Sequence, residues 1–349
     1  MTLSDVLAAF GAVFDAVTEA IFAMSFGFAM VPSALAFLVG IIGCLAFNSV
    51  VPISFQAETI TMAGSLGRNT RERISIVFFS GISMALIGAF GLLSQIVAFA
   101  GEDIIYAMMA GVGIILTKIS IDLVKEDIAV GASSMVAAIA TYILTEDLVY
   151  TVMVGVIISS VVAYFFGTHP EIKDENKKFV LQKPIMNLTV LKGALAVICI
   201  SIGGNIAFGS ITADIAGTTA NADHISIYSG IADAVSSIFG GAPISVIISP
   251  TGAADNAQLS AIILMAIMGV ILITGLLPKI AKFIPVQAIS GTLFVLGAIL
   301  TTPEYAQLSL MSEGSNVMAS GITMVVTAVS NPFFGLISGI FVKMIGFVL

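Results

Sequence analysis

Charged residues are scarce in this chain of 349 residues: Asp, Glu, Lys and Arg together make up 10% of it, and tryptophan is absent. Soluble globular proteins contain about 25% charged residues, so the composition excludes that class. The 58% hydrophobic content and the mean hydropathy of +1.11 indicate a chain that lies within a membrane. At roughly 20 apolar residues per spanning helix, the length predicts about fourteen crossings.

Basic residues and cysteines are also few. The 13 basic and 21 acidic residues argue against nucleic acid as a partner, because binding phosphates needs clustered Lys and Arg. Cys44 and Cys199 are far apart and show no CxxC spacing, and no GxxxxGK[ST] or HExxH run is present. We therefore expect no enzyme activity and no cofactor. The expected partners are a small-molecule substrate, membrane lipid and, as one option, a second copy of the chain.

Apolar runs on both sides of a charged central stretch predict an all-α membrane protein with two halves. The halves are residues 1–167 and 188–349, and the linker between them is residues 168–187. If each half crosses the membrane seven times, the second half lies upside down relative to the first. The helices that the apolar runs predict are 10–30, 33–47, 74–99, 104–123, 128–144, 148–166, 191–217, 225–239, 261–277, 284–300, 308–329 and 333–349.

Two segments, 48–66 and 240–257, are rich in Pro, Ser and Gly and do not read as spanning helices. Both contain the tripeptide Pro-Ile-Ser, at residues 52–54 and 243–245, and each follows two predicted helices of its half. Chance recurrence of a tripeptide is the simpler interpretation. The matching position and composition favour an inverted repeat, in which such interrupted segments mark the substrate site of a transporter.

The stretch 226–252, SIYSGIADAVSSIFGGAPISVIISPTG, resembles the ninth and tenth segments of the xanthine/uracil permease family (nucleobase:cation symporter-2). The likeness is closest to the adenine/guanine/hypoxanthine branch. Residues 213–219, ADIAGTT, look like its eighth segment, and residues 107–121 and 284–300 are similar to its fifth and twelfth. The resemblance implies fourteen segments in two inverted sevens, with two half-helices that each follow a short extended strand. It also implies that Asp214 contacts a nucleobase.

Ionisable residues within a membrane cost about 2.5–3.5 kcal/mol each on insertion scales and are functional candidates by default. The family carries an acid six positions after its turn proline, where this chain has Ser249, whereas Glu58 lies six positions after Pro52. We therefore predict that Glu58 and Asp214 form the polar centre and serve substrate and proton coupling, since a carboxylate in a dry cavity can exchange protons as access alternates. Further predicted substrate contacts are Ser249, Thr218, Ser245, Phe26 and Phe55, although simple packing explains the two phenylalanines equally well. Weaker candidates are Asp15, Glu19, Lys118 and Asp233.

These features predict a secondary-active transporter of a small planar solute, a purine or pyrimidine base carried by proton symport with alternating access. One alternative keeps the fold and transports a small anion, as in the related sulfate-permease families. The acids at the predicted centre count against that alternative. A second alternative is a membrane protein that transports nothing, such as a receptor.

The sequence predicts a multi-pass protein of the plasma membrane. Its basic residues lie in the connections on one side of the membrane. The connections after even-numbered segments hold no Lys or Arg and carry acids instead. The positive-inside rule therefore places the central linker in the cytoplasm and both termini outside, whereas the family resemblance implies the opposite. The basic residues of the odd connections are Arg68, Arg71, Arg73, Lys125, Lys173, Lys177, Lys178, Lys183, Lys279 and Lys282.

Overall fold

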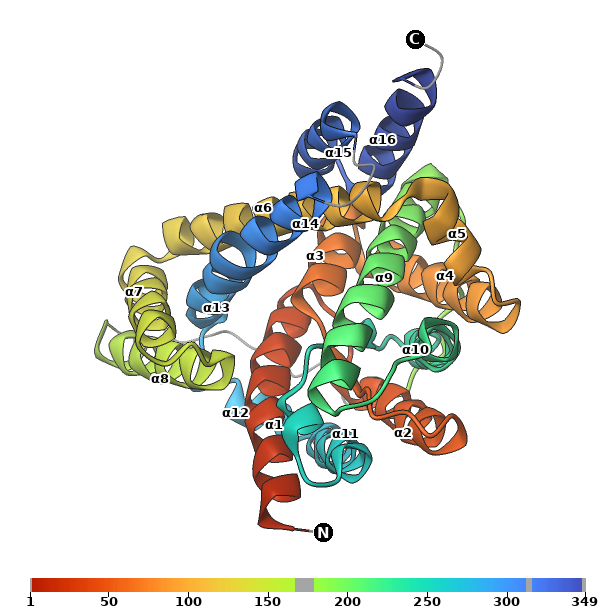
Figure 1. Cartoon of the computed structure of the whole chain (residues 1–349). Helices are drawn as coiled ribbons and strands as arrows, with labels where there is room; N and C mark the ends of the chain where they lie inside the picture. Colours follow the sequence, from red (N-terminus) through yellow and green to blue (C-terminus); the bar gives the residue numbers. More distant parts are fainter. Residues whose placement is uncertain (1, 167–178, 312–315, 347–349) are drawn as a thin grey trace.

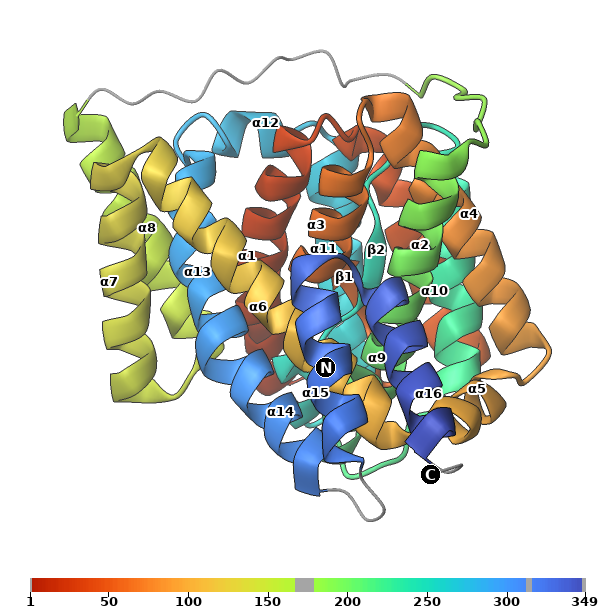
Figure 2. The same cartoon turned by 90° about the horizontal axis from the view of Figure 1, so that it is seen from above.

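The computed structural model describes residues 2–166, 179–311 and 316–346, and nearly all of its regular structure is helical. The helices form two groups that stand beside each other (Figure 1). Figure 2, turned by 90°, shows the long helices of both groups running across the same layer. Residues 168–178 of the predicted linker, with His169, Lys173, Lys177 and Lys178, lie outside the described residues.

We call the first group the strand bundle, because it contains the two strands of the described chain. Its helices pack through α4 on α10, α2 on α10 and α11, and α9 on α4. Its elements are α1 (Leu3–Ser25), α2 (Met30–Ala46), β1 (Ile53–Phe55), α3 (Ala57–Leu66), α4 (Thr70–Ala89), α9 (Leu188–Ile215), α10 (Ala222–Ser237), β2 (Ile244–Val246), the 3₁₀ turn η1 (Pro250–Ala253) and α11 (Ala257–Ile273).

The second group, the helical bundle, is built around α6, which packs against α14, α15 and η3. Its elements are α6 (Glu102–Glu126), α7 (Ile128–Thr145), α8 (Leu148–Phe166), α13 (Ser290–Phe294), the π-helical turn η3 (Val295–Thr301), α14 (Thr302–Met311), α15 (Val317–Val329) and α16 (Pro332–Gly346). The connections between the bundles include α5 (Leu93–Ala100), α12 (Leu277–Ile280) and the 3₁₀ turn η2 (Val286–Ile289).

Seven helical stretches of the described residues are long and apolar enough to cross a membrane, and four shorter apolar helices accompany them. The chain is thus a multi-pass membrane protein, while the count of fourteen crossings stays a prediction. The shorter helices are α2, α11, α15 and α16.

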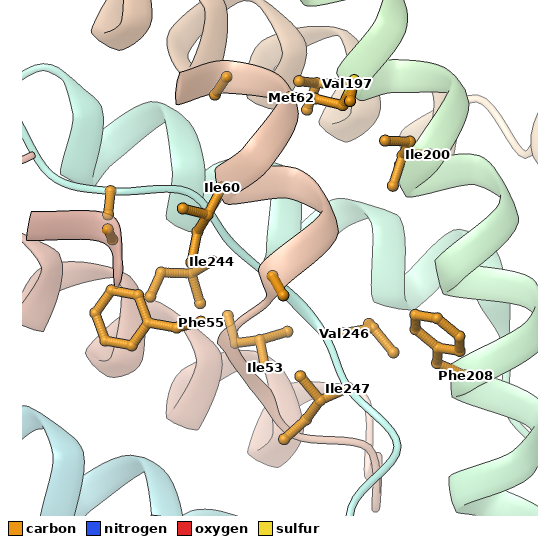
Figure 3. Close-up of a cluster of buried hydrophobic side chains, with 14 of the residues drawn as sticks. Ile53, Phe55, Ile60, Met62, Val197, Ile200, Phe208, Ile244, Val246 and Ile247 are labelled. Carbon is orange, nitrogen blue, oxygen red and sulfur yellow. The ribbon is translucent and has the colours of Figure 1, made fainter. Parts of the chain in front are cut away.

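The two Pro-Ile-Ser motifs meet at the centre of the strand bundle. Strands β1 and β2 pair antiparallel, and the serines that end the two motifs, Ser54 and Ser245, lie opposite each other. This pairing satisfies backbone groups that lipid could not. The apolar side chains of both strands are fully buried, and Figure 3 shows them gathered with Ile60 of α3 and Phe208 of α9. The pairing agrees with an inverted repeat, which itself stays a prediction.

The segment after β2 differs from the prediction of two matching half-helices. After β1 the chain forms the ten-residue helix α3, but after β2 it forms only η1, a turn of four residues. Residues 250–256, PTGAADN, explain the difference, because Gly, Asp and Asn favour caps and turns over helix interiors. Asn256 then begins the next helix, since its side chain accepts a hydrogen bond from the Leu259 N–H at 3.0 Å.

Two predicted helix boundaries are wrong for local reasons. The expected helix 74–99 is broken into α4 and α5 by a turn in which Gly91 has φ +62°, a conformation that suits glycine. The expected break at 301–307 is absent, because the chain stays helical from η3 into α14. Pro303 cannot donate to the turn before it and clashes with it, and the π-helical turn just before this proline accommodates the ring.

Close approach of backbones holds the strand bundle together at α4 and α10. A Cβ added to Gly81 would lie 2.7 Å from the Gly230 carbonyl oxygen, and one added to Gly230 would lie 2.5 Å from the Gly81 carbonyl oxygen. Only glycine at both positions permits this contact, which resembles the small-residue interfaces of membrane helices.

Candidate functional site

A cavity of about 250 Å³ lies at the boundary between the two bundles. Its apolar wall includes Phe208 of α9, Ile247 just after β2 and Leu300 of η3. Its lining within the described chain contains no Lys, Arg or His but includes five carboxylic acids. The strand bundle contributes Asp15, Glu19 and Glu58, and Glu146 and Glu304 come from the other side of the boundary.

The three acids of the strand bundle are organised around the start of α3. Asp15 and Glu19 are four residues apart on α1 and therefore lie on one face of it. Glu19 Oε1 accepts a hydrogen bond from the Ala57 N–H at 3.1 Å, which satisfies one of the free donors at the helix terminus. Glu58 follows in the first turn of α3 and is 5% exposed.

Several buried polar atoms of this cavity have no hydrogen-bond partner among the described residues. They are Asp15 Oδ1, Glu19 Oε2, both amide atoms of Gln56 and the Tyr305 hydroxyl. A buried polar group without a partner costs about 1–3 kcal/mol. Gln56 occupies the N-cap position of α3, but its side chain makes no capping bond. These atoms are therefore available to a bound solute.

The structure places Glu58 in this cavity, together with the weaker candidates Asp15 and Glu19, and the other predicted substrate contacts elsewhere. Asp214 is exposed near the end of α9 and Thr218 is exposed in the following turn. Ser245 lies buried within β2. Ser249 is fully buried, caps η1 and lies 2.8 Å from the Thr251 hydroxyl.

The two predicted aromatic contacts pack within the protein. The Phe55 ring is fully buried, with its centroid 5.5 Å from that of Phe37. The centroids of the Phe26 and Phe22 rings are 5.2 Å apart, and the Arg73 guanidinium carbon lies 5.5 Å from the centroid of the Phe26 ring. Neither ring lines the cavity between the bundles.

The remaining ionisable candidates have structural partners or face outward. Asp233 is buried, and its carboxylate accepts a hydrogen bond from the Ile244 N–H at 2.7 Å, which ties β2 to α10. Lys118 is exposed on α6. Lys343 lies 2.7 Å from Asp103, so one basic group stands at the face where the sequence predicts only acids. No group of three or more His, Cys, Asp or Glu placed to hold a metal occurs among the described residues.

Gln56, Glu146, Glu304 and Tyr305 line the cavity but were not predicted from the sequence. Gln56 had a usable signal, since it stands directly between the first irregular strand and Glu58. Glu304 and Tyr305 fell in a predicted loop, because the continuation of helix through Pro303 was not expected. Their approach to Glu58 depends on packing between distant segments.

Two bundles with a buried pair of short strands between their helices form a fold that is similar to solved structures of membrane transporters. The transmembrane domain of a cyanobacterium bicarbonate transporter, BicA, matches 97% of this chain over 97% of its own length, with a TM-score of 0.69 and 13% identity. The overall structure of SLC26A9 matches 98% of this chain over 64% of its own length, with a TM-score of 0.71 and 14% identity.

The murine Slc26a9 anion transporter, in its inward-facing state, matches 99% of this chain over 68% of its own length, with a TM-score of 0.73 and 13% identity. The chain thus spans about two thirds of the SLC26A9 structures. These identities establish the fold alone. The solved structures are transporters rather than enzymes.

No protein-family model matches the chain, and no curated protein matches it. The assignment to the xanthine/uracil permease family is therefore wrong, because the structural neighbours are the anion transporters BicA and SLC26A9. The matched stretches are rich in Gly, Ala, Ser and aliphatic residues, which close packing of membrane helices requires in many families. The acid expected where Ser249 stands is also missing.

Proposed function

We propose that the protein is a secondary-active transporter of a small anion and works by alternating access. The observation that carries the proposal is the cavity at the boundary of two bundles, in a fold that covers almost all of this chain and almost all of the transmembrane domain of a bicarbonate transporter. A nucleobase substrate is not supported, because the structural neighbours are anion transporters.

We propose that the strand bundle moves relative to the helical bundle during transport. Its helices α1, α3 and α9 and the residues that follow the two strands form one side of the cavity, while η3, α14 and the end of α7 form the other side. A relative shift of the bundles would open the cavity to one face and close it to the other, as in transporters built from two repeats. This motion needs no change within β1 and β2.

The acids of the cavity require that positive charge accompanies the anion. Two unit charges of like sign at about 5 Å repel by about 3 kcal/mol at an effective dielectric constant of 20. Among the described residues the lining holds five carboxylic acids and no basic residue, so a bare anion would meet several such repulsions. Protons remove this repulsion, and we assign their binding to Glu58, which lines the cavity. Asp214 lies outside the cavity, so its role in coupling stays a prediction.

Uptake by the purified protein in proteoliposomes tests the function. The panel contains labelled hydrogencarbonate, chloride, sulfate and two nucleobases, with and without an inward proton gradient. We expect saturable uptake of at least one anion, accelerated by the gradient, and no uptake of the bases.

Glu58→Gln is the matched test of proton coupling, and it should abolish the acceleration by the gradient. Glu126→Gln, which changes an exposed acid of α6, should leave it intact. Uptake of a nucleobase without uptake of any anion would contradict the proposal.

A further inference from the structure

Basic side chains gather where the connection from α3 to α4 meets the segment that leads into α9. Figure 2 shows both stretches at the same edge of the molecule. Two hydrogen bonds join them, since Arg71 Nε donates to the Lys183 carbonyl oxygen at 3.1 Å and the Ile185 N–H donates to Ser75 Oγ at 2.9 Å. Arg68, Arg71 and Lys183 are all exposed. We call these three residues the basic surface.

The charges of the basic surface have no acidic partner within the described residues. Lys125, by contrast, pairs with Asp122 at 2.9 Å. The acid beside the basic surface is Glu72, which is only 7% exposed. Its two carboxylate oxygens accept hydrogen bonds from the Arg68 N–H at 2.9 Å and from Asn187 Nδ2 at 2.8 Å. Three outward positive charges therefore stand over one enclosed negative charge.

Exposed apolar side chains flank the basic surface. Leu181 is 66% exposed, Met186 57% and Leu188 66%. Residues 179–187 form neither helix nor strand, and such backbone does not occur in the hydrocarbon core where lipid surrounds it. The segment therefore lies at the level of the lipid headgroups. At this level apolar side chains reach toward the acyl chains while basic groups stay among the phosphates.

We propose that the basic surface binds the headgroups of anionic phospholipids in the adjacent leaflet. Charge complementarity carries the proposal, because each Lys or Arg near an anionic leaflet strengthens binding about fivefold. Arg71 spends Nε on the Lys183 carbonyl oxygen, which leaves its two terminal nitrogens for a phosphate group. None of the three residues lines the cavity between the bundles. The proposal is thus independent of the transported solute.

The absence of tryptophan from the chain makes the lipids around one position measurable. Leu181→Trp places a single fluorescent reporter next to the basic surface, and Ile143→Trp, at a position 70% exposed on α7 of the other bundle, is the matched control. Each variant is reconstituted in vesicles of equal parts phosphatidylcholine and phosphatidylglycerol, with one lipid or the other brominated as quencher. We expect phosphatidylglycerol to be enriched about fivefold at position 181 and not at position 143.

Charge-matched variants test the residues. The combination of Arg68→Gln, Arg71→Gln and Lys183→Gln should remove the enrichment at position 181. Arg71→Lys keeps the charge and loses the Nε hydrogen bond, so it should keep most of the enrichment. A control that removes the same number of charges from other exposed basic residues should also keep it. Its substitutions are Lys125→Gln, Lys279→Gln and Lys282→Gln.

The outcomes separate a lipid site from simpler explanations. Equal lipid composition at positions 181 and 143 overturns the proposal, and this comparison leaves the basic surface intact, so it decides even if a variant does not fold. Equal loss of enrichment in the two triple variants overturns the assignment to these residues, as does enrichment that survives in both. Inorganic phosphate, compared with sulfate at the same ionic strength, should not displace the lipid. Displacement by phosphate alone would show a site for soluble phosphate compounds and would overturn the proposal.

Discussion

Removing the carboxylate of Glu19 should weaken the start of α3 and thereby the whole protein. Glu19 Oε1 accepts from the Ala57 N–H at 3.1 Å, and Ala57 is fully buried. A hydrogen bond contributes about 0.5–1.5 kcal/mol, and leaving the buried N–H without a partner costs about 1–3 kcal/mol. We therefore expect Glu19→Ala to lower the free energy of unfolding by about 2–3 kcal/mol.

Glu19→Gln keeps the hydrogen bond and removes the carboxyl group. The amide oxygen of Gln can still accept from the Ala57 N–H, so we expect a change within about 1 kcal/mol. Reversible unfolding in mixed detergent micelles measures both variants, with Glu126→Ala on the exposed surface of α6 as control. The reasoning is refuted if Glu19→Ala unfolds like the control, or if Glu19→Gln is the less stable of the two variants.

Three further predictions concern packing, orientation and the second irregular segment. Gly230→Val places a Cβ 2.5 Å from the backbone of α4 and should reduce thermal stability sharply, whereas Gly321→Ala, with open space around it, should not; equal melting temperatures would contradict this. Lys282→Cys should be protected from an impermeant thiol reagent in intact cells and Thr145→Cys should be labelled, and the reverse pattern would overturn the predicted topology. Ser249→Glu puts a carboxylate at a fully buried position and should shift the pH dependence of uptake, so an unchanged pH profile would speak against a place for this segment in coupling.

The helices were predictable because they depend on local composition. Long apolar runs specify membrane helices directly, and α6, α7 and α8 lie within a few residues of their predicted ranges. The two strands were also within reach, since Pro-Ile-Ser in a Gly-rich and Ser-rich setting cannot continue a helix. Their mutual pairing was not predicted, because it depends on the packing of two distant segments.

The cavity was less predictable because its residues converge from distant segments. Glu58 could be selected, since an acid beside an irregular segment is rare in a membrane protein. Gln56 is uncharged and is marked only by its place between the first irregular strand and Glu58, and Tyr305 lies in a segment that the sequence predicts as a loop. Asp214 was selected by analogy with a family, and the structure leaves it exposed at the end of α9.

The second half-helix shows the limit of reasoning by symmetry. The repeat implied that the segment after β2 copies α3, but the residues themselves, with Gly252 and Asn256, favour turns and caps. Local composition decided the outcome at this point. An internal repeat can indicate where the chain leaves a regular helix, but the residues of each copy determine whether a helix or a turn follows.

Chemical modification within the cavity tests the central claim most directly, namely that a small anion passes between the two bundles. Leu300→Cys, made in a chain with Cys44→Ala and Cys199→Ala, places a single thiol in the cavity wall. The account predicts that a thiol reagent at position 300 blocks hydrogencarbonate uptake and that hydrogencarbonate slows the modification. Full uptake after complete modification, with no protection by any anion, would contradict it.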